Sequence, residues 1–296
     1  MFWTLLLSLS ADFSSWIVGN EINHSNWKYY DELRIGSFVS INSSGHTQCL
    51  PNQQFMDAKH LFMNQKTKII SSAFDPTPCI NDPLCNYCQN IYNTLPQTFE
   101  DCGGSSIISG LEFDYEWGGT YHTKNHGMAT NFTLMMNYIQ RHLGNDYTVS
   151  ADVGVNPFET PWVDAKIFKQ NSKLVINTMS YHTPRDCSIF LWIADANIVT
   201  YEWGISPQQT RIGIGFFSVI RDHKGKIVRE PLYKDIEEIC PNQPTRCICN
   251  GVSYVSSIMA QKINKFSMEH RYKGLFPWAS NYDSITNSII SQLSSN

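Results

Sequence analysis

Three carboxylic acids at alternate positions mark the most chemically informative segment of this 296-residue chain. Glu112, Asp114 and Glu116 are interleaved with large apolar residues in the run SGLEFDYEW, residues 109–117. Side chains alternate between the two faces of a β-strand, so the three acids share one face, with neighbours roughly 6.6 to 6.8 Å apart along the backbone. Acids this close repel one another, which spreads their pKa values and leaves at least one protonated near neutral pH. A protonated carboxyl group of this kind is what general acid catalysis needs.

A solvated edge strand is the structural alternative for this segment. An amphipathic surface strand shows the same alternation, but it usually mixes Lys and Thr among its polar positions. No lysine or arginine stands among these acids in the sequence. A fold tolerates such repulsion where the charges are useful or solvated, so we interpret the segment as catalytic.

The segment resembles the strand-four signature of glycoside hydrolase family 18, which reads Asp-Gly-x-Asp-x-Asp-x-Glu. Gly110, Asp114 and Glu116 match this signature, whereas Ser109 and Glu112 stand where the family has its first two aspartates. The resemblance implies that Glu116 is the general acid, which protonates the glycosidic oxygen. It also implies substrate assistance, in which the sugar's own 2-acetamido oxygen attacks the anomeric carbon. Asp114 would then orient the acetamido group and stabilise it as an oxazolinium.

Two later segments strengthen the resemblance. Residues 179–182, MSYH, are similar to the family's Met-x-Tyr-Asp element, with His182 in place of the aspartate. Tyr181 would donate its hydroxyl to the acetamido oxygen. Trp278, in the run Phe-Pro-Trp, matches the tryptophan that forms the floor of the sugar site. A buried tyrosine bonded to backbone and a plain core tryptophan are the structural alternatives.

The remaining substrate-binding candidates have weaker support. Glu112 is expected to lie deeper than Asp114 and to share hydrogen bonds or a proton with it. Asp152 and His182 are also candidates, although a loop aspartate and a hydrogen-bonded histidine explain them equally well. The third strand departs from the family, because it reads SSAF at residues 71–74 where Ser-x-Gly-Gly is usual.

The elements that would position these residues alternate between strands and helices, which predicts a (β/α)8 barrel in a single domain over residues 1–296. Strands are expected at residues 2–11, 33–41, 68–74, 109–117, 147–153, 174–181, 211–217 and 274–279. Helices are expected at 26–32, 55–65 and 252–271, and most clearly from Thr130 or Asn131 to Leu143. The cysteine-rich stretch 76–104 is expected to be a long loop with one helix. Barrel enzymes keep their sites at the carboxyl ends of the strands, where the candidate residues would meet.

The first of these strands has an alternative. Residues 2–11 are apolar enough to be the central region of a signal peptide, but no positive charge precedes them. We interpret them as the first barrel strand, because the count of strand–helix units then reaches eight.

The nine cysteines predict disulfides rather than zinc. They fall into two clusters and two single positions: Cys79, Cys85, Cys88 and Cys102; Cys240, Cys247 and Cys249; Cys49; and Cys187. The second cluster lacks metal-finger spacing, and no nearby histidine completes a ligand set. Disulfides that staple loops imply an oxidising compartment, either secretion or the lumen of the lysosome or endomembrane system. Sequons at Asn23, Asn42 and Asn131 agree with a secreted glycoprotein.

Composition excludes several classes of function. The net charge of −4 gives no argument for nucleic acid or an anionic membrane surface, and no apolar run reaches the roughly 18 to 20 residues of a membrane span. Aromatic residues make up 13% of the chain, which suits a cleft walled with rings. We expect a monomer that needs no cofactor or metal and binds oligosaccharides or polysaccharides containing N-acetylglucosamine.

The resulting hypothesis is a retaining hydrolase of β-1,4-linked N-acetylglucosamine, in chitin, chitooligosaccharides or the N-glycan core. Two alternatives remain. One is a carbohydrate-binding lectin on the same barrel, which the substitutions Ser109, Glu112 and His182 keep open. The other is a barrel glycosidase of another family that uses two carboxylates.

The general-acid assignment predicts that Glu116→Gln keeps the fold and sugar binding but loses nearly all hydrolysis. The amide is nearly isosteric but cannot supply the proton, and general acid catalysis contributes on the order of 10²- to 10⁴-fold. Hydrolysis and oligosaccharide binding, measured on the same preparation, check the prediction. An unchanged rate in the variant would exclude Glu116 as the acid.

Overall fold

The computed structural model describes residues 12–17, 26–114, 126–155, 163–182, 187–218, 220–221, 227–229, 231–240, 246–250, 252–284 and 288–294. Glu116 and residues 2–11 lie outside these ranges, as does Asn23.

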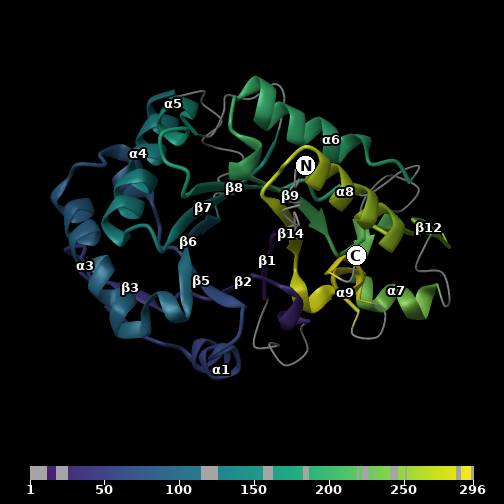
Figure 1. Ribbon diagram of the computed structural model, residues 1–296, viewed down its shortest axis with the longest axis horizontal. Coiled ribbons are helices and arrows are strands. Elements are labelled where there is room, and N and C mark those ends of the chain that lie inside the picture. The colour runs from purple at the N-terminus through teal and green to yellow at the C-terminus, as the bar shows by residue number, and fades with distance from the viewer. Residues whose placement is uncertain are drawn as a thin grey trace, which may run out of the picture.

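Eight parallel strands form a closed barrel, which confirms the predicted (β/α)8 architecture (Figure 1). In chain order the strands are β1 (Asp12–Trp16), β2 (Glu32–Ile35), β5 (Lys68–Ser72), β6 (Ile108–Asp114), β7 (Thr148–Val153), β8 (Leu174–Thr178), β9 (Thr210–Gly215) and β14 (Gly274–Trp278). Each strand pairs with the next around the ring, and β1 closes it between β14 and β2. The carboxyl ends of all eight strands therefore point to one mouth.

The first barrel strand is Asp12–Trp16, so the prediction that residues 2–11 form it was wrong. That prediction followed hydrophobicity, but β1 has to supply polar side chains to the barrel interior. Asp12 Oδ2 lies 2.9 Å from Arg211 Nη2 and 3.1 Å from Lys273 Nζ. A run of leucines could not have made these contacts.

Several strands are shorter than predicted. The segment 33–41 contains two strands, because β2 ends at Ile35 and β3 (Val39–Ile41) pairs antiparallel with β4 (Thr47–Cys49). Strand β8 ends at Thr178, so Tyr181 and His182 follow it in a loop. The remaining short strands form two hairpins: β10 (Ile220–Arg221) with β11 (Ile227–Arg229), and β12 (Ile248–Cys249) with β13 (Val252–Ser253).

Helices surround the barrel on the outside (Figure 1). They are α1 (Gln53–Phe62), α2 (Thr77–Asn81), α3 (Asn86–Cys102), α4 (His126–Leu143), α5 (Ala165–Phe168), α6 (Phe190–Asn197), α7 (Tyr233–Ile239), α8 (Ser257–Glu269) and α9 (Ile289–Ser294). Shorter helical turns are η2 (Trp27–Tyr29), η3 (Gly104–Ser106), the π-helical η4 (Ile198–Glu202), η5 (Pro207–Gln209) and η6 (Ser280–Tyr282). Side-chain caps start two of the main helices: Asn52 Oδ1 accepts from Phe55 N at 2.8 Å, and Ser256 caps α8.

The cysteine-rich stretch is mostly helical, with α2 and α3 where one helix in a long loop was predicted. Helix α3 buries Ile91, Leu95 and Phe99 completely, at the i, i+4 and i+8 spacing of one helical face. The cysteines and Pro96 obscured this stripe in the sequence. The helix packs against α4, which begins at His126, several residues before the predicted cap.

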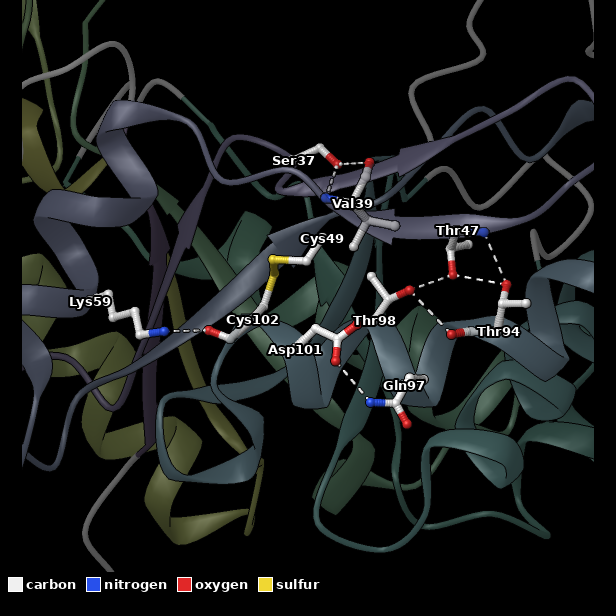
Figure 2. The surroundings of a disulfide bond; sticks show 10 residues. All are labelled: Ser37, Val39, Thr47, Cys49, Lys59, Thr94, Gln97, Thr98, Asp101 and Cys102. Atoms are coloured by element: carbon white, nitrogen blue, oxygen red, sulfur yellow. Dashed lines mark hydrogen bonds between the residues drawn. A yellow bond between two sulfur atoms is a disulfide. The ribbon is translucent and has the colours of Figure 1, made fainter.

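Four disulfides connect the surface elements, as the cysteine count predicted. The pairs are Cys49–Cys102, Cys79–Cys88, Cys187–Cys247 and Cys240–Cys249, and Cys85 is a free thiol. Cys49–Cys102 joins the β3–β4 hairpin to the end of α3 (Figure 2). The hydroxyl of Thr47 reinforces this contact by bonding to Thr94 at 2.9 Å and Thr98 at 2.7 Å.

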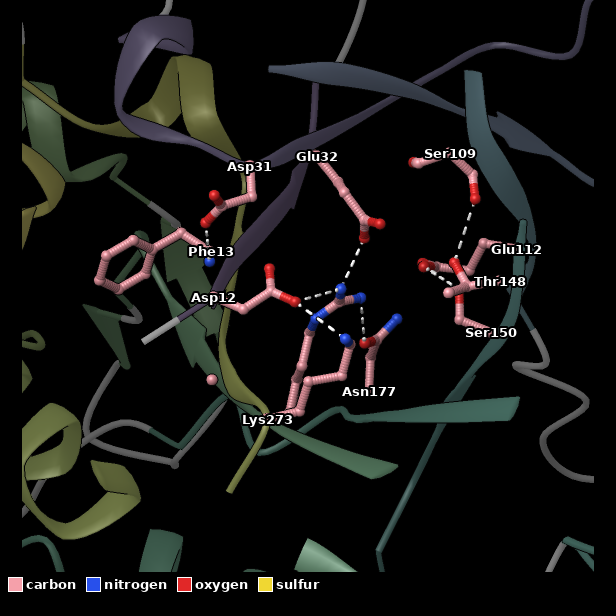
Figure 3. A network of polar contacts seen from close by, with 12 residues as sticks. Asp12, Phe13, Asp31, Glu32, Ser109, Glu112, Thr148, Ser150, Asn177 and Lys273 are labelled. Carbon is pink, nitrogen blue, oxygen red and sulfur yellow. Dashed lines mark hydrogen bonds and ion pairs between the residues drawn. The ribbon is translucent and has the colours of Figure 1, made fainter. Parts of the chain in front are cut away.

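The barrel interior is charged. On the amino-terminal side Arg211 is fully buried, and its guanidinium pairs with Asp12 at 2.9 Å and Glu32 at 2.6 Å (Figure 3). Burial alone would raise the pKa of Asp12, but Arg211 and Lys273 outweigh it and the pKa is lowered. Apolar residues such as Leu33 and Leu111 alternate with the inward polar ones and belong to the buried core.

The disulfide pattern predicts unequal losses of stability. Cys49–Cys102 spans 53 residues and Cys240–Cys249 spans 9. Loop-closure entropy then gives about 4 kcal/mol for the first and about 2.6 kcal/mol for the second. Urea unfolding of Cys49→Ala/Cys102→Ala and of Cys240→Ala/Cys249→Ala measures the two free energies. Equal losses, or a larger loss for the second pair, would contradict this ordering.

Candidate active site

A cavity of about 370 Å³ opens at the carboxyl ends of the strands. It is lined by Trp16, Ser72, Ala73, Phe74, Asp75, Pro76, Phe113 and Asp114. The residues come from the ends of β1, β5 and β6 and from the loop after β5. The cavity thus places an exposed carboxylate, Asp114, beside aromatic rings at the mouth where barrel enzymes keep their sites.

The register of β6 against its neighbours sets the depth of the acids. Asp114 is opposite Asp152 on β7, and Glu112 is opposite Ser150, one step further into the barrel. Glu112 is completely buried, accepts a hydrogen bond from the Ser150 hydroxyl and forms an ion pair with Arg34 (Figure 3 shows Glu112 and Ser150). The predicted depth of Glu112 relative to Asp114 fits this register. Its partners include Arg34 and Ser150, and the sharing of hydrogen bonds or a proton with Asp114 stays a prediction.

Arg34 is the residue that sequence reasoning missed. Its side chain is completely buried in the barrel, where the guanidinium pairs with Glu112 and donates from Nη1 to Asp152 Oδ2 at 3.0 Å. The guanidinium carbon also lies 4.0 Å from the ring centroid of Trp16 and 5.3 Å from that of Phe276. The sequence suggested that these acids had no cation nearby, but the fold brings Arg34 to them. The available signal was an arginine between the apolar residues of the second strand.

Asp152 is in register with Asp114 but is almost completely buried and is not among the residues that line the cavity. Its carboxylate accepts hydrogen bonds from Trp16 Nε1 at 3.0 Å, from Arg34, and from Asn177 Nδ2 at 2.8 Å. Burial raises the pKa of Asp152, and Arg34 and the hydrogen bonds from Asn177 and Trp16 oppose that shift. Asp152 is thus joined to the cavity wall through Trp16.

Three aromatic rings meet at the mouth. The rings of Trp16 and Trp278 are 5.4 Å apart at 64°, and Tyr181 lies 6.1 Å from Trp278. Tyr181 also contacts Phe217, with centroids 6.2 Å apart. The structure therefore brings together the predicted pair Tyr181 and Trp278 and adds Trp16, which the misplaced first strand had hidden. All three side chains are partly exposed, but the exposed part of Tyr181 is its ring, because its hydroxyl is buried.

His182 belongs to a separate pair on the β8 side of the mouth. Its Nε2 lies 2.7 Å from Asp195 Oδ2, and its ring stands edge-on to Trp192 at 5.3 Å. Both partners are in α6, so this helix fixes the imidazole. The sequence analysis singled out neither Asp195 nor Trp192.

Glu116, two positions beyond Asp114, lies outside the described residues, and its role remains a prediction. Within the ranges that the structure describes, no group of three or more His, Cys, Asp or Glu side chains could hold a metal ion. No helix found in those ranges is both long and apolar enough to cross a membrane.

The sequence matches no family model and no curated protein. The fold, however, matches solved chitinases over nearly the whole chain. A chitinase from Bacteroides thetaiotaomicron superposes with a TM-score of 0.75 at 14% identity, covering 96% of each chain. A GH18 chitinase from the chitin utilization locus of Flavobacterium johnsoniae gives 0.73 at 11% identity, covering 97% of this chain and 93% of that one. A GH18 chitinase from Cycas revoluta, solved in complex with (GlcNAc)3, gives 0.68 at 14%, covering 96% and 99%.

The fold is that of the family 18 chitinases. This agrees with the resemblance found at the acidic strand, which was based on residue types alone. At 11–14% identity the likeness concerns the fold, and the chemistry has to be argued from the residues at the mouth.

The hydrogen bond from Trp16 to Asp152 predicts energetic coupling between the two residues. Trp16→Phe keeps an aromatic ring but removes the donor, which leaves a buried carboxylate oxygen with one partner fewer at a cost of about 1 to 3 kcal/mol. Asp152→Asn weakens the acceptor. In urea unfolding, the double variant should lose less stability than the sum of the two single variants. Additivity within about 0.5 kcal/mol would show that the hydrogen bond contributes nothing.

Proposed function

We propose that this protein is a retaining glycoside hydrolase that cleaves β-1,4-linked N-acetylglucosamine in chitin, chitooligosaccharides or the N-glycan core. One observation carries the proposal: Asp114 and Trp16 line a cavity at the mouth of a family 18 chitinase fold, with Trp278 against Trp16 and Tyr181 against Trp278. A carboxylate among aromatic rings suits a sugar, because rings stack on its apolar face while the carboxylate contacts its polar groups.

The reaction proceeds in two steps that share one carboxylic acid. Glu116 gives its proton to the glycosidic oxygen as the bond from that oxygen to the anomeric carbon breaks. The 2-acetamido oxygen of the same sugar attacks the anomeric carbon from the opposite face and forms an oxazolinium. Glu116, now ionised, takes a proton from water, and the water opens the oxazolinium with retention of configuration.

Asp114 and Tyr181 act on the acetamido group during these steps. The Asp114 carboxylate faces the positive charge that develops on the acetamido nitrogen, and the Tyr181 hydroxyl donates to the acetamido oxygen. Because the charge develops only along the reaction, a fixed carboxylate there stabilises the transition state more than the bound substrate. Trp278 and Trp16 provide apolar surface for the sugar ring.

The other predicted binding residues take supporting positions. Glu112 and Asp152 are buried beneath the cavity, so we assign them to the charged layer that underlies Asp114 rather than to direct sugar contact. His182, held by Asp195, is at the edge of the mouth and is available to a sugar hydroxyl. Four disulfides are typical of secreted or lumenal proteins, and we place the protein in such a compartment.

Matched tetrasaccharides test the reaction. If the acetamido group is the nucleophile, its replacement by a hydroxyl removes an intramolecular attack that can lower the barrier by about 7 to 11 kcal/mol. Chitotetraose should therefore be cleaved, and cellotetraose should be inert under the same conditions. A thiazoline mimic of the cyclised intermediate should inhibit the cleavage.

Each other outcome points to a different function. Comparable rates on both sugars would contradict substrate assistance and favour a glycosidase that uses two carboxylates. Binding of chitotetraose without cleavage of either sugar would show that the protein is a lectin.

A further inference from the structure

A completely buried positive charge, that of Arg34, interacts electrostatically with Asp114, one of the proposed catalytic carboxylates. We infer that Arg34 is a positioning residue, which holds Glu112 and Asp152 ionised below the cavity and thereby keeps Asp114 ionised at its surface. The inference rests on the proposed hydrolase function, and it concerns which carboxyl groups of that site are ionised.

Arg34 forms ion pairs with two carboxylates, which come from two different strands. Nη2 pairs with Glu112 of β6, and Nη1 lies 3.0 Å from Asp152 Oδ2 of β7. The side chains of Arg34 and Glu112 are completely buried, and that of Asp152 is 2% exposed. Water therefore screens these charges little, so the guanidinium is what offsets the cost of burying the acids.

Asp114 stands on the same strand as Glu112, two residues closer to the mouth. A neutral Glu112 could share its proton with Asp114, as the sequence analysis expected. An ionised Glu112, paired with Arg34 and bonded by the Ser150 hydroxyl, has no proton to share. The function of Asp114, which is to meet a developing positive charge, requires its ionised form.

The groups that interact electrostatically with Arg34 come from several sides of the barrel. They are Glu112 and Asp114 of β6, Asp152 of β7, Tyr181 after β8 and Arg211 of β9. Burial lowers the pKa of Arg34 to about 10, against the opposing effect of Asp152, Asp114 and Tyr181. The guanidinium thus stays protonated at neutral pH. The rings of Trp16 and Phe276 fix its plane from the β1 and β14 sides.

Arg34 acts on the walls of the cavity as well as on its charges. Trp16 lies over the guanidinium and donates from Nε1 to Asp152, and the same ring lines the cavity next to Asp114. A displaced Arg34 would therefore shift both the acids and an aromatic wall. Misplacement of a reacting group by about 1 Å can cost on the order of 10²-fold in rate.

Arg211 provides a matched control. It is also a fully buried arginine that pairs with two carboxylates, Asp12 and Glu32, at the amino-terminal side of the barrel. It is linked to Asp152 less directly than Arg34 is, through Asn177, which lies 3.5 Å from Arg211 Nη1 and donates to Asp152 at 2.8 Å. Arg34→Met leaves two buried acids, Glu112 and Asp152, without their principal cation. Arg211→Met removes the same kind of charge from Glu32 and from Asp12, which is 24% exposed and keeps Lys273 at 3.1 Å. A purely structural role for Arg34 would make the two variants behave alike.

The experiment compares the pH dependence of kcat and KM for chitotetraose in these variants. For Arg34→Met we expect kcat to fall on the order of 10²-fold with little change in KM, and the acid limb of kcat to move to higher pH. Arg34→Lys, which keeps the charge, should return the acid limb towards its original position. Arg211→Met, whose charge acts on Asp152 from further away, should move the acid limb much less than Arg34→Met does. Equal shifts in both Met variants, or a change in KM alone, would overturn the inference.

A second measurement decides the case where Arg34→Met folds poorly or the protein hydrolyses no sugar. Burial already raises the pKa of Asp152 against the opposing effect of Arg34, and the loss of Arg34 raises it further. The folded state then binds protons that the unfolded chain releases. Stability must then fall more steeply with rising pH between about pH 5 and pH 8 than in the unaltered protein. Urea midpoints measure this slope, and Arg34→Met/Glu112→Gln, which removes one acid, should reduce it.

The two failures are distinguishable. Absence of hydrolysis in the unaltered protein would reject the proposed function, while the pH slope of the urea midpoint would still decide the role of Arg34. A slope that is unchanged by Arg34→Met would show that Arg34 does not hold these acids ionised.

Discussion

Charge inside a closed barrel must be balanced there, because water and salt screen it only weakly. The ion pairs of Arg34 with Glu112 and Asp152 satisfy this constraint on the side of the barrel that faces the cavity. Arg211 satisfies it on the opposite side, with Asp12 and Glu32. Removing one partner of a buried ion pair usually costs about 3 to 5 kcal/mol of stability. A charged residue on one strand can therefore change only together with its partner on another strand.

The site depends on this balance. Strand β6 can present Asp114 to the cavity because Glu112, one step below, is already paired. Strand β7 likewise supplies Asp152, whose carboxylate connects Arg34 to the Nε1 of Trp16. The aromatic surface at the mouth, from Trp16 through Trp278 to Tyr181, is therefore attached to the charged layer beneath it. We interpret the mouth and the layer below it as one unit.

The sequence predicts the barrel well where local signals are strong. Strands β6, β7 and β14 lie where alternation and aromatic content placed them, and Tyr181 and Trp278 meet as the resemblance implied. It fails where the deciding contact is remote in the chain. Strand β1 was misplaced because the contacts that hold it, from Asp12 to Arg211 and Lys273, are made with residues far away in the sequence. Arg34 was missed because its partners, Glu112 and Asp152, also lie far away in the sequence. The length of helix α3 was underestimated because cysteines and a proline obscured its apolar face.

The stereochemistry of the product tests the central claim most directly. Proton NMR during the first minutes of chitooligosaccharide hydrolysis shows which anomer of the new reducing end forms before mutarotation. Attack by the acetamido oxygen followed by water inverts the anomeric carbon twice, so the account predicts that the β-anomer appears first. Initial release of the α-anomer would mean direct attack by water, and it would contradict the roles given to Asp114 and Tyr181.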